Sequence, residues 1–271
     1  MKRRVRAGIV SLALTGLVAV IADGPEAAAR TVQTPPQVGR PGCADDVPVR
    51  ATRTLIRFES RGRPIRGWLY RPGGPANGIG LVMLHGGTGF EMNSILFDAH
   101  AIQLASRGYS VLLPAYFDAG APDRSRRVVT ARAWRQAALD AAARLAEEPG
   151  VAAGEVALWG YSRGAGVAVD AMAASDGAVR SAVLAAGGGS FDDRFTQAAP
   201  AFLLLHARSD EAVPVRATLK LAEDLAAAGA GVAVHELDFD GHQYDLPTWC
   251  AVMDRTRTFL EQRREPGDGP A

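Results

Sequence analysis

A glycine-flanked serine is the residue best suited to nucleophilic chemistry in this sequence. Residues 160–164 read Gly-Tyr-Ser-Arg-Gly, the pattern G-x-S-x-G, with Ser162 at its centre. An apolar run, 155–160, precedes it and a small-residue run, 165–169, follows it, which predicts a sharp turn from a strand into a helix. Flanking glycines relieve crowding in such a turn, and the helix N-terminus behind the serine favours negative charge. We therefore predict that Ser162 is a nucleophile.

A serine hydroxyl needs a general base at neutral pH, and a histidine is the usual one. Of the five histidines, His242 lies in the loop after the last predicted strand, 232–237. His100 is expected on a helix, at its surface or in packing, whereas His206 and His235 lie within strand-like runs and are expected to be buried polar groups of the core. We therefore predict that His242 is the base.

A carboxylate should orient this histidine, and Asp210 is the best candidate. It lies in the loop 207–214, between a predicted strand and a predicted helix, where an aspartate could also simply begin the helix. The nearest rival is Glu211, and weaker ones are Asp192, Asp193, Asp238 and Asp240. The order serine, aspartate, histidine along the chain favours Asp210 as the acid of a catalytic triad.

A glycine-rich loop follows the predicted strand 81–85 and reads His-Gly-Gly-Thr-Gly from His85 to Gly89. Backbone N–H groups in such a loop can stabilise the oxyanion that forms when an acyl carbonyl is attacked. We predict that the amides of Gly87 and Arg163 form this oxyanion hole, with Thr88 as the alternative donor. The alternative for the loop is a simple turn, and a phosphate loop is disfavoured because no Lys-Ser/Thr pair follows the glycines.

Alternating strand and helix patterns predict how these residues are positioned. A hairpin opens the pattern, and short apolar runs then alternate with helical segments, which is typical of a mostly parallel sheet with helices on both faces. The predicted strands are 53–59, 65–70, 81–85, 109–114, 155–160, 181–186, 201–206 and 232–237, and the predicted helices cover 95–106, the region around Trp134 up to residue 149, 165–169, 215–228 and a segment from Pro247. In such sheets ligands bind at the carboxyl ends of the strands, where all the candidate residues lie.

Length and composition indicate one globular α/β domain, which we place at residues 51–264 of 271. The net charge of +1 gives no reason to expect a nucleic-acid partner, and no metal-ligand spacing is visible, so we expect no cofactor. Residues 30–50 are predicted to be an N-terminal arm or linker, and 265–271 a disordered tail.

The first residues have the pattern of an export signal. Positive charges at residues 2–4 and 6 precede a mostly apolar stretch, 7–22, and three alanines at 27–29 offer a cleavage site. We predict a signal peptide at 1–29 and an exported protein, periplasmic or secreted, without stable membrane insertion after cleavage; an uncleaved anchor is the alternative. Outside the cytosol, Cys43 and Cys250 could form a disulfide that ties the arm to the last helix, or they could be two buried thiols.

Four segments together resemble the dienelactone hydrolase-like branch of the α/β-hydrolases: 82–87, 107–114, 160–164 and the pair Gly241-His242. The resemblance implies the α/β-hydrolase fold. Dienelactone hydrolases proper use a cysteine nucleophile, and Ser162 at that position favours a general carboxylic ester hydrolase instead. Only residues 187–200 separate two late strands, so we expect no large cap domain.

An uncapped site predicts an open, shallow cleft with aromatic side chains at its rim. The candidates are Tyr116, Phe117 and Tyr161, with Phe191 or Tyr244 as further possibilities, although all could simply be packed in the core.

The predicted function is hydrolysis of carboxylic esters or lactones through an acyl-enzyme intermediate, with a small-molecule ester as substrate. A peptidase or an acyltransferase could use the same triad. A non-catalytic exported binding protein is the alternative from a different class, and the sequence leaves the oligomeric state open.

Overall fold

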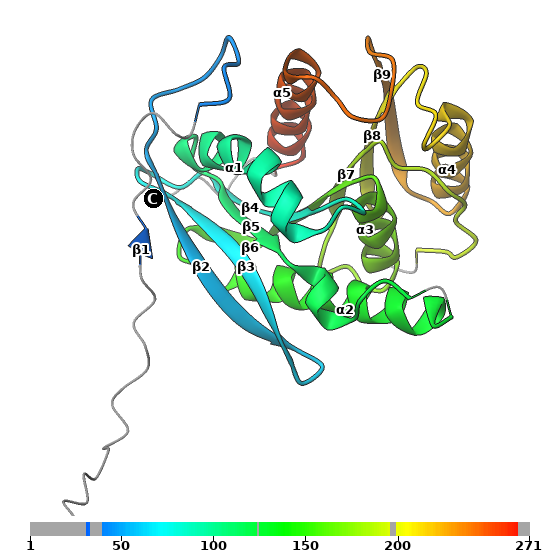
Figure 1. The fold of residues 1–271 in the computed structure, drawn as a ribbon, viewed down its shortest axis with the longest axis horizontal. Coiled ribbons are helices and arrows are strands. Elements are labelled where there is room, and N and C mark those ends of the chain that lie inside the picture. Colours follow the sequence, from blue (N-terminus) through cyan, green and yellow to red (C-terminus); the bar gives the residue numbers. More distant parts are fainter. Residues whose placement is uncertain (1–30, 33–39, 124, 196–198, 265–271) are drawn as a thin grey trace, which may run out of the picture.

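A single mixed sheet forms the centre of the molecule. The computed structural model describes residues 31–32, 40–123, 125–195 and 199–264. Within these residues the sheet has nine strands in the order β1-β2-β3-β5-β4-β6-β7-β8-β9. The pairs from β1 to β5 along this order are antiparallel, and all pairs from β5 through β4 to β9 are parallel. The predicted α/β-hydrolase architecture is confirmed (Figure 1).

The elements follow the predicted alternation. The strands are β1 (Thr31–Val32), β2 (Ala51–Ser60), β3 (Arg63–Pro72), β4 (Gly78–Leu84), β5 (Ser110–Pro114), β6 (Val151–Tyr161), β7 (Ser181–Ala185), β8 (Ala201–Ala207) and β9 (Gly231–Leu237). The helices are α1 (Phe90–Ser106), the 3-10 helix η1 (Tyr116–Ala119), α2 (Arg127–Ala146), α3 (Arg163–Ala173), α4 (Val215–Ala227) and α5 (Leu246–Arg263).

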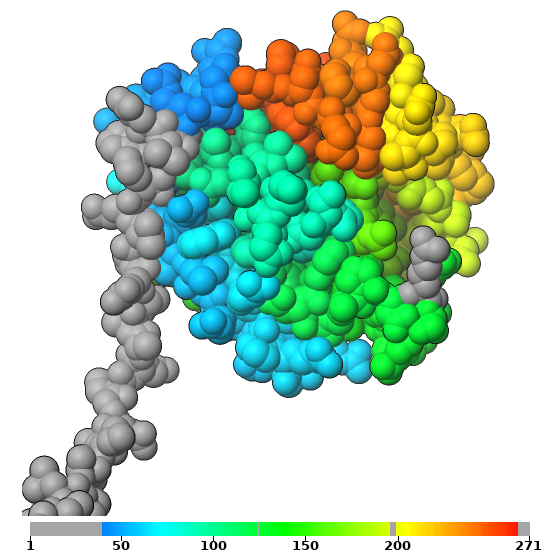
Figure 2. Space-filling model, in the orientation of Figure 1, coloured from blue at the N-terminus to red at the C-terminus, as the bar shows by residue number. Residues whose placement is uncertain are grey.

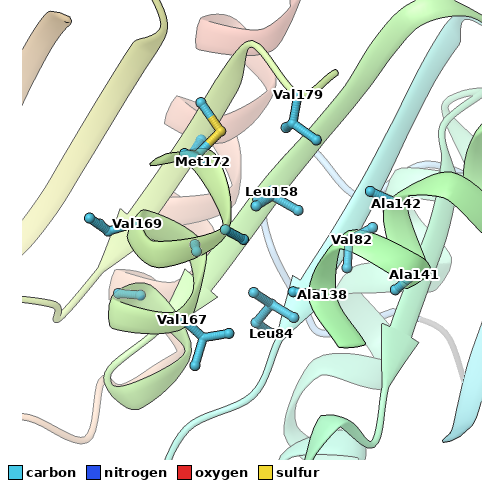
Figure 3. Close-up of a cluster of buried hydrophobic side chains, with 14 of the residues drawn as sticks. Val82, Leu84, Ala138, Ala141, Ala142, Leu158, Val167, Val169, Met172 and Val179 are labelled. Atoms are coloured by element: carbon cyan, nitrogen blue, oxygen red, sulfur yellow. The ribbon is translucent and has the colours of Figure 1, made fainter. Parts of the chain in front are cut away.

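Two apolar clusters hold helices against the two faces of the sheet, because successive strand residues point to opposite sides. In β4, Val82 and Leu84 belong to the cluster that includes residues of α2, α3 and α4, whereas Leu81 and Met83 belong to the cluster that includes residues of α1 and α5. Figure 3 shows the first cluster, in which residues of α2 and α3 meet Leu158 of β6. The central strands are buried on both faces, as expected for parallel strands.

Two elements differ from the sequence-based expectation. Helix α1 begins at Phe90, five residues before the predicted start at 95, because polar Glu91, Asn93 and Ser94 hide the apolar periodicity of its first turns. Strand β9 is largely exposed, because it lies at the sheet edge and pairs with β8 alone. The prediction that His235 is a buried core residue is therefore wrong: it is exposed on β9.

The segment 40–50 is fastened to the domain. A disulfide joins Cys43 to Cys250 of α5, and Figure 2 shows the segment, in blue, beside the orange and red C-terminal region. The backbone of Val47 exchanges two hydrogen bonds with the side-chain amide of Gln103 on α1, at 2.9 and 3.0 Å. These bonds make residues 40–50 an arm that packs on α1 and α5 and not a free linker.

Between β7 and β8 the described residues contain no helix or strand, so no large cap covers the sheet there. The predicted signal peptide, 1–29, and the predicted tail, 265–271, lie outside the described residues, and export of the protein stays a prediction. Within the described part of the chain, none of the helices combines the length and the apolar character needed to span a membrane.

The disulfide predicts a measurable loss of stability on its removal. It closes a loop with a sequence separation of 207 residues, so it restricts the unfolded chain strongly. Replacing Cys43→Ser and Cys250→Ser together should lower the free energy of unfolding by about 2–5 kcal/mol in urea titrations. The reduced wild type should match the double variant, and an unchanged urea midpoint in both would contradict the expectation.

Buried histidines predict a pH dependence of stability. Burial lowers the pKa of both His85 and His100 to about 4. In the unfolded chain these histidines protonate near pH 6.5, so between pH 6.5 and 4 the unfolded state binds more protons and stability falls with falling pH. Each contributes up to about 1.4 kcal/mol per pH unit within that window.

Urea titrations between pH 7 and pH 5 measure this slope before most carboxylates titrate. The variant His100→Gln should flatten it relative to wild type, because it removes one of three histidines, His85, His100 and His206, whose pKa burial lowers. The exposed His235→Gln serves as the matched control. A wild-type slope in His100→Gln would show that His100 does not carry the effect.

Candidate active site

The turn at Ser162 connects β6 to α3 with a strained backbone. Ser162 has φ 55° and ψ −114°, a conformation that non-glycine residues rarely adopt. A Cβ on Gly160 would lie 2.4 Å from the carbonyl oxygen of Gly164, and one on Gly164 would lie 2.2 Å from that of Leu84. The turn packs so closely on itself and on the end of β4 that only glycine fits on either side of the serine.

Ser162, His242 and Asp210 form one chain of hydrogen-bonding contacts. His242 Nε2 lies 2.9 Å from Ser162 Oγ, and His242 Nδ1 lies 2.7 Å from Asp210 Oδ2. The three residues follow the ends of β6, β8 and β9. In the sequence, His242 lies 80 residues after Ser162 and 32 residues after Asp210. The fold thus brings together the three residues predicted from the sequence.

The loop after β8 holds Asp210 in place. Its side chain is buried, and its Oδ1 accepts the backbone N–H groups of Ala212 and Val213 at 2.9 and 2.8 Å. His206 Nε2 lies 2.7 Å from the carbonyl oxygen of Val213, so this buried histidine supports the loop from below, in agreement with its predicted role as a core polar group. The rival carboxylates are exposed: Asp192, Asp193, Glu211, Asp238 and Asp240.

Tyr161 positions His242 through a hydrogen bond and ring stacking. Its hydroxyl donates to the backbone carbonyl of His242 at 2.8 Å, and the two rings stack with centroids 5.4 Å apart. Burial, with the nearby charge of Asp210, raises the pKa of Tyr161 to about 12, so the phenol keeps the proton that it donates. Tyr161 therefore orients both the backbone and the ring of the histidine.

Asn93 organises the glycine-rich loop from the first turn of α1. Its Oδ1 accepts the N–H of Gly86 at 2.5 Å, and its Nδ2 donates to Thr88 Oγ1 at 2.7 Å. On the other side, His85 Nδ1 donates to the carbonyl of Gly86 at 2.9 Å, which fixes the tautomer of this buried, neutral ring. The loop is thus held at both ends while Gly87 and Thr88 remain exposed.

The side chain of Arg163, one predicted oxyanion donor, lies close to Gly87, the other. A Cβ on Gly87 would lie 3.3 Å from Nε of Arg163, the first residue of α3. Within the described residues, neither the Gly87 nor the Arg163 amide has an acceptor in the protein. Thr88, the alternative donor, likewise has no acceptor for its amide among the described residues, and its hydroxyl oxygen accepts a hydrogen bond from Asn93 Nδ2. The amides of Gly87 and Arg163 are therefore available to an atom bound at Ser162.

The expected aromatic rim is only partly present. Tyr116 and Tyr161 are 0% and 3% exposed, so the prediction that they line an open cleft is wrong. Tyr116 donates its hydroxyl to the His85 carbonyl and stacks on that ring, and Tyr161 is occupied with His242. Tyr244 is also buried, whereas Phe117 is half-buried and contacts the His85 ring. Hydrogen bonds to the backbone explain why the tyrosines turn inward.

Two residues of the site were not given their roles by sequence reasoning. Asn93 was missed, although an asparagine in the first turn after a glycine-rich loop is a usable signal. Tyr161 was assigned to the cleft because its position beside Ser162 does not reveal which way its ring points.

The described residues contain one grouping that could hold a metal ion by geometry, namely Cys43, Asp45 and Asp46. Cys43 is bonded to Cys250, so it has no thiolate to offer. This grouping therefore gives no metal site.

Solved structures with the same fold include single-domain enzymes and larger peptidases. A dienelactone hydrolase-like promiscuous phosphotriesterase from metagenomic libraries is 17% identical, with a TM-score of 0.65 and coverage of 79% of this chain and 98% of that one. Est1E from Butyrivibrio proteoclasticus is 14% identical, with a TM-score of 0.59 and coverage of 77% and 99%. The acylaminoacyl peptidase of Pyrococcus horikoshii is 16% identical, with a TM-score of 0.62 and coverage of 82% and 43%, so this chain spans less than half of that protein.

The sequence itself matches a family. Among curated proteins no sequence matches the chain. The sequence model of the dienelactone hydrolase family, however, matches residues 65–244, which include the Gly-rich loop, Ser162, Asp210 and His242. This match extends over more than half of the chain and over every element of the candidate site, and the chain therefore belongs to the dienelactone hydrolase family of α/β-hydrolases.

Proposed function

We propose that the protein is a serine hydrolase that cleaves carboxylic esters, lactones included, through an acyl-enzyme intermediate. The observation that carries the proposal is the pair of contacts at His242, 2.9 Å to Ser162 Oγ and 2.7 Å to Asp210 Oδ2. A hydroxyl, an imidazole and a buried carboxylate in this order can pass one proton while the hydroxyl attacks a carbonyl.

In the acylation step, Ser162 Oγ attacks the ester carbonyl carbon and His242 Nε2 takes the hydroxyl proton. Asp210 accepts the Nδ1–H of the histidine and stabilises the imidazolium that results. The carbonyl oxygen becomes an oxyanion, which the amides of Gly87 and Arg163 receive at the N-terminus of α3. His242 then gives the proton to the leaving alcohol, and the acyl group stays on Ser162.

In the deacylation step, His242 removes a proton from water, and the hydroxide attacks the acyl carbonyl. The second tetrahedral intermediate uses the same two amides, and Ser162 leaves as the alcohol when His242 returns the proton. His242 is positioned to supply the single proton that the leaving alcohol of an ester needs.

The nucleophile is tested by covalent labelling. The purified protein should react with a fluorophosphonate probe and hydrolyse p-nitrophenyl acetate, whereas Ser162→Ala should lose the labelling and at least about 10⁴-fold in kcat. Mass spectrometry should find the probe on the peptide that contains Ser162.

Ser94→Ala, on α1, is the matched control and should label like the wild type. Labelling that persists in a folded Ser162→Ala variant would refute the assignment. An unreactive wild type would favour a non-catalytic binding protein.

The positioning of His242 by the Tyr161 hydroxyl is tested with the variant Tyr161→Phe. The variant keeps the stacked ring but loses the hydrogen bond to the His242 carbonyl, worth about 1 kcal/mol. We expect kcat to fall about fivefold with KM unchanged, because the ground state does not depend on the histidine's alignment. Tyr109→Phe, which loses a similar bond to Glu261, is the control for stability. A rise in KM at constant kcat would instead point to a substrate contact.

A further inference from the structure

A groove lies between α2 and α3, next to the proposed nucleophile but outside the residues of the triad. Its volume is about 640 Å³, within the range of pockets that hold small organic ligands. On α3 it is lined by Arg163, Gly166, Val167 and Asp170, which share one helix face because they are spaced by three, four and seven residues. On α2 it is lined by Ala131 and Trp134 among others.

The residue that follows the proposed nucleophile lines the groove. Arg163 directly follows Ser162, and its guanidinium lies between the glycine-rich loop and Trp134. Its Nε is 3.3 Å from a Cβ built on Gly87, and its Cζ is 5.7 Å from the centre of the Trp134 ring. From Arg163 to Asp170 the helix rises ~10 Å. A group bound along this face would therefore extend from the reacting carbonyl well beyond the length of an acetyl group.

The groove has an apolar floor, and its charged lining residues are Asp123 and Arg127 on the α2 side and Arg163 and Asp170 on α3. Val167 and Trp134 are nearly buried and form its floor, and Figure 3 shows Val167 on the side of α3 that faces α2. Arg163 lies at the end near Ser162 and Asp170 at the opposite end of the α3 face. An apolar floor of this kind favours a hydrocarbon or aromatic body by excluding water from it.

The position of His242 decides which half of an ester the groove receives. The leaving alcohol must lie beside His242, because that histidine protonates it. Neither His242 nor any residue of its loop or of the Asp210 loop lines the groove, whereas Arg163, one of the two proposed oxyanion donors, does. With the carbonyl oxygen at the amides and the alcohol at His242, the acyl chain is the part that remains to be placed.

We propose that the groove between α2 and α3 is the acyl-binding site, and that it selects esters of medium-chain or aryl acids over acetyl esters. This inference rests on the proposed function, because it assigns a substrate class to the same nucleophile.

Gly166 is a position at which a larger side chain would fill the groove. It lies in the first turns of α3, faces the groove, and a Cβ built there meets nothing within 4 Å. A large side chain at this position would fill the groove without a clash at Cβ, and a non-glycine residue also favours the helix. Gly166→Phe and Gly166→Leu should therefore fold with thermal midpoints no lower than that of the wild type.

The experiment compares p-nitrophenyl octanoate with p-nitrophenyl acetate, which share one leaving group. In Gly166→Phe and Gly166→Leu the ratio of kcat/KM, octanoate over acetate, should fall by about tenfold or more. Gly166→Ala should stay within about twofold of the wild-type ratio. Gly74→Phe, at another open glycine outside the groove, is the matched control.

A second arm varies the alcohol, octyl acetate against ethyl acetate, and its ratio should not respond to Gly166→Phe. A ratio of octanoate to acetate that is unchanged in both large variants, or a loss confined to the alcohol arm, would overturn the inference while leaving the proposed function intact. A wild type that hydrolyses neither p-nitrophenyl ester would overturn the proposed function and this inference together.

Discussion

The close packing of the turn at Ser162 against the end of β4 is the constraint on which the rest of the site depends. Gly164 approaches the carbonyl oxygen of Leu84 so closely that a Cβ would lie 2.2 Å from it. This contact sets β6 and α3 against the strand that continues into the glycine-rich loop. The same approach therefore places the serine, the N-terminus of α3 and the exposed Gly87 within one small region. Strain at Ser162 is stored in a turn that packing holds from both sides.

Positioning of the histidine depends on a different and larger part of the molecule. His242 belongs to the loop between β9 and α5. Tyr161, which positions it, is part of an aromatic cluster with Phe97 of α1 and Trp249 of α5. Helix α5 is in turn tied to the N-terminal arm by the Cys43–Cys250 disulfide. The proposed base is thus supported by residues from the beginning and the end of the domain, whereas the proposed nucleophile is supported by its centre.

The proposed division of the substrate follows from the same arrangement. Arg163, a proposed oxyanion donor, and the α2–α3 groove belong to α3, whereas the proposed proton-transfer residues, Asp210 and His242, belong to the loops after β8 and β9. Recognition of the acyl group can therefore change through residues of the groove, such as Gly166, without disturbing the contacts at His242. Separation of this kind agrees with the general observation that one fold supports many specificities through its surrounding residues.

Much of this protein could be inferred from its sequence, because the strongest signals are local. Apolar runs bounded by glycine or proline predicted the parallel strands, and G-x-S-x-G between a strand and a helix predicted the turn at Ser162, since both depend on neighbours in the chain. The match to the dienelactone hydrolase family agrees with those local motifs. The start of α1 was misplaced because Asn93 is buried by hydrogen bonds to a loop and not by apolar character.

What only the tertiary structure decided are the directions of side chains and the contacts across long sequence separations. The sequence placed Tyr116 and Tyr161 near the site, but only the fold turned them inward, because their hydroxyls find backbone carbonyls there. It did not distinguish a core His235 from one on an exposed edge, since a short apolar run does not reveal whether a strand has one neighbour or two. The groove between α2 and α3 was likewise invisible, because its walls are two helices whose packing no local pattern encodes. Residue types and order determined the chemistry available to this protein, and packing decided where that chemistry can reach.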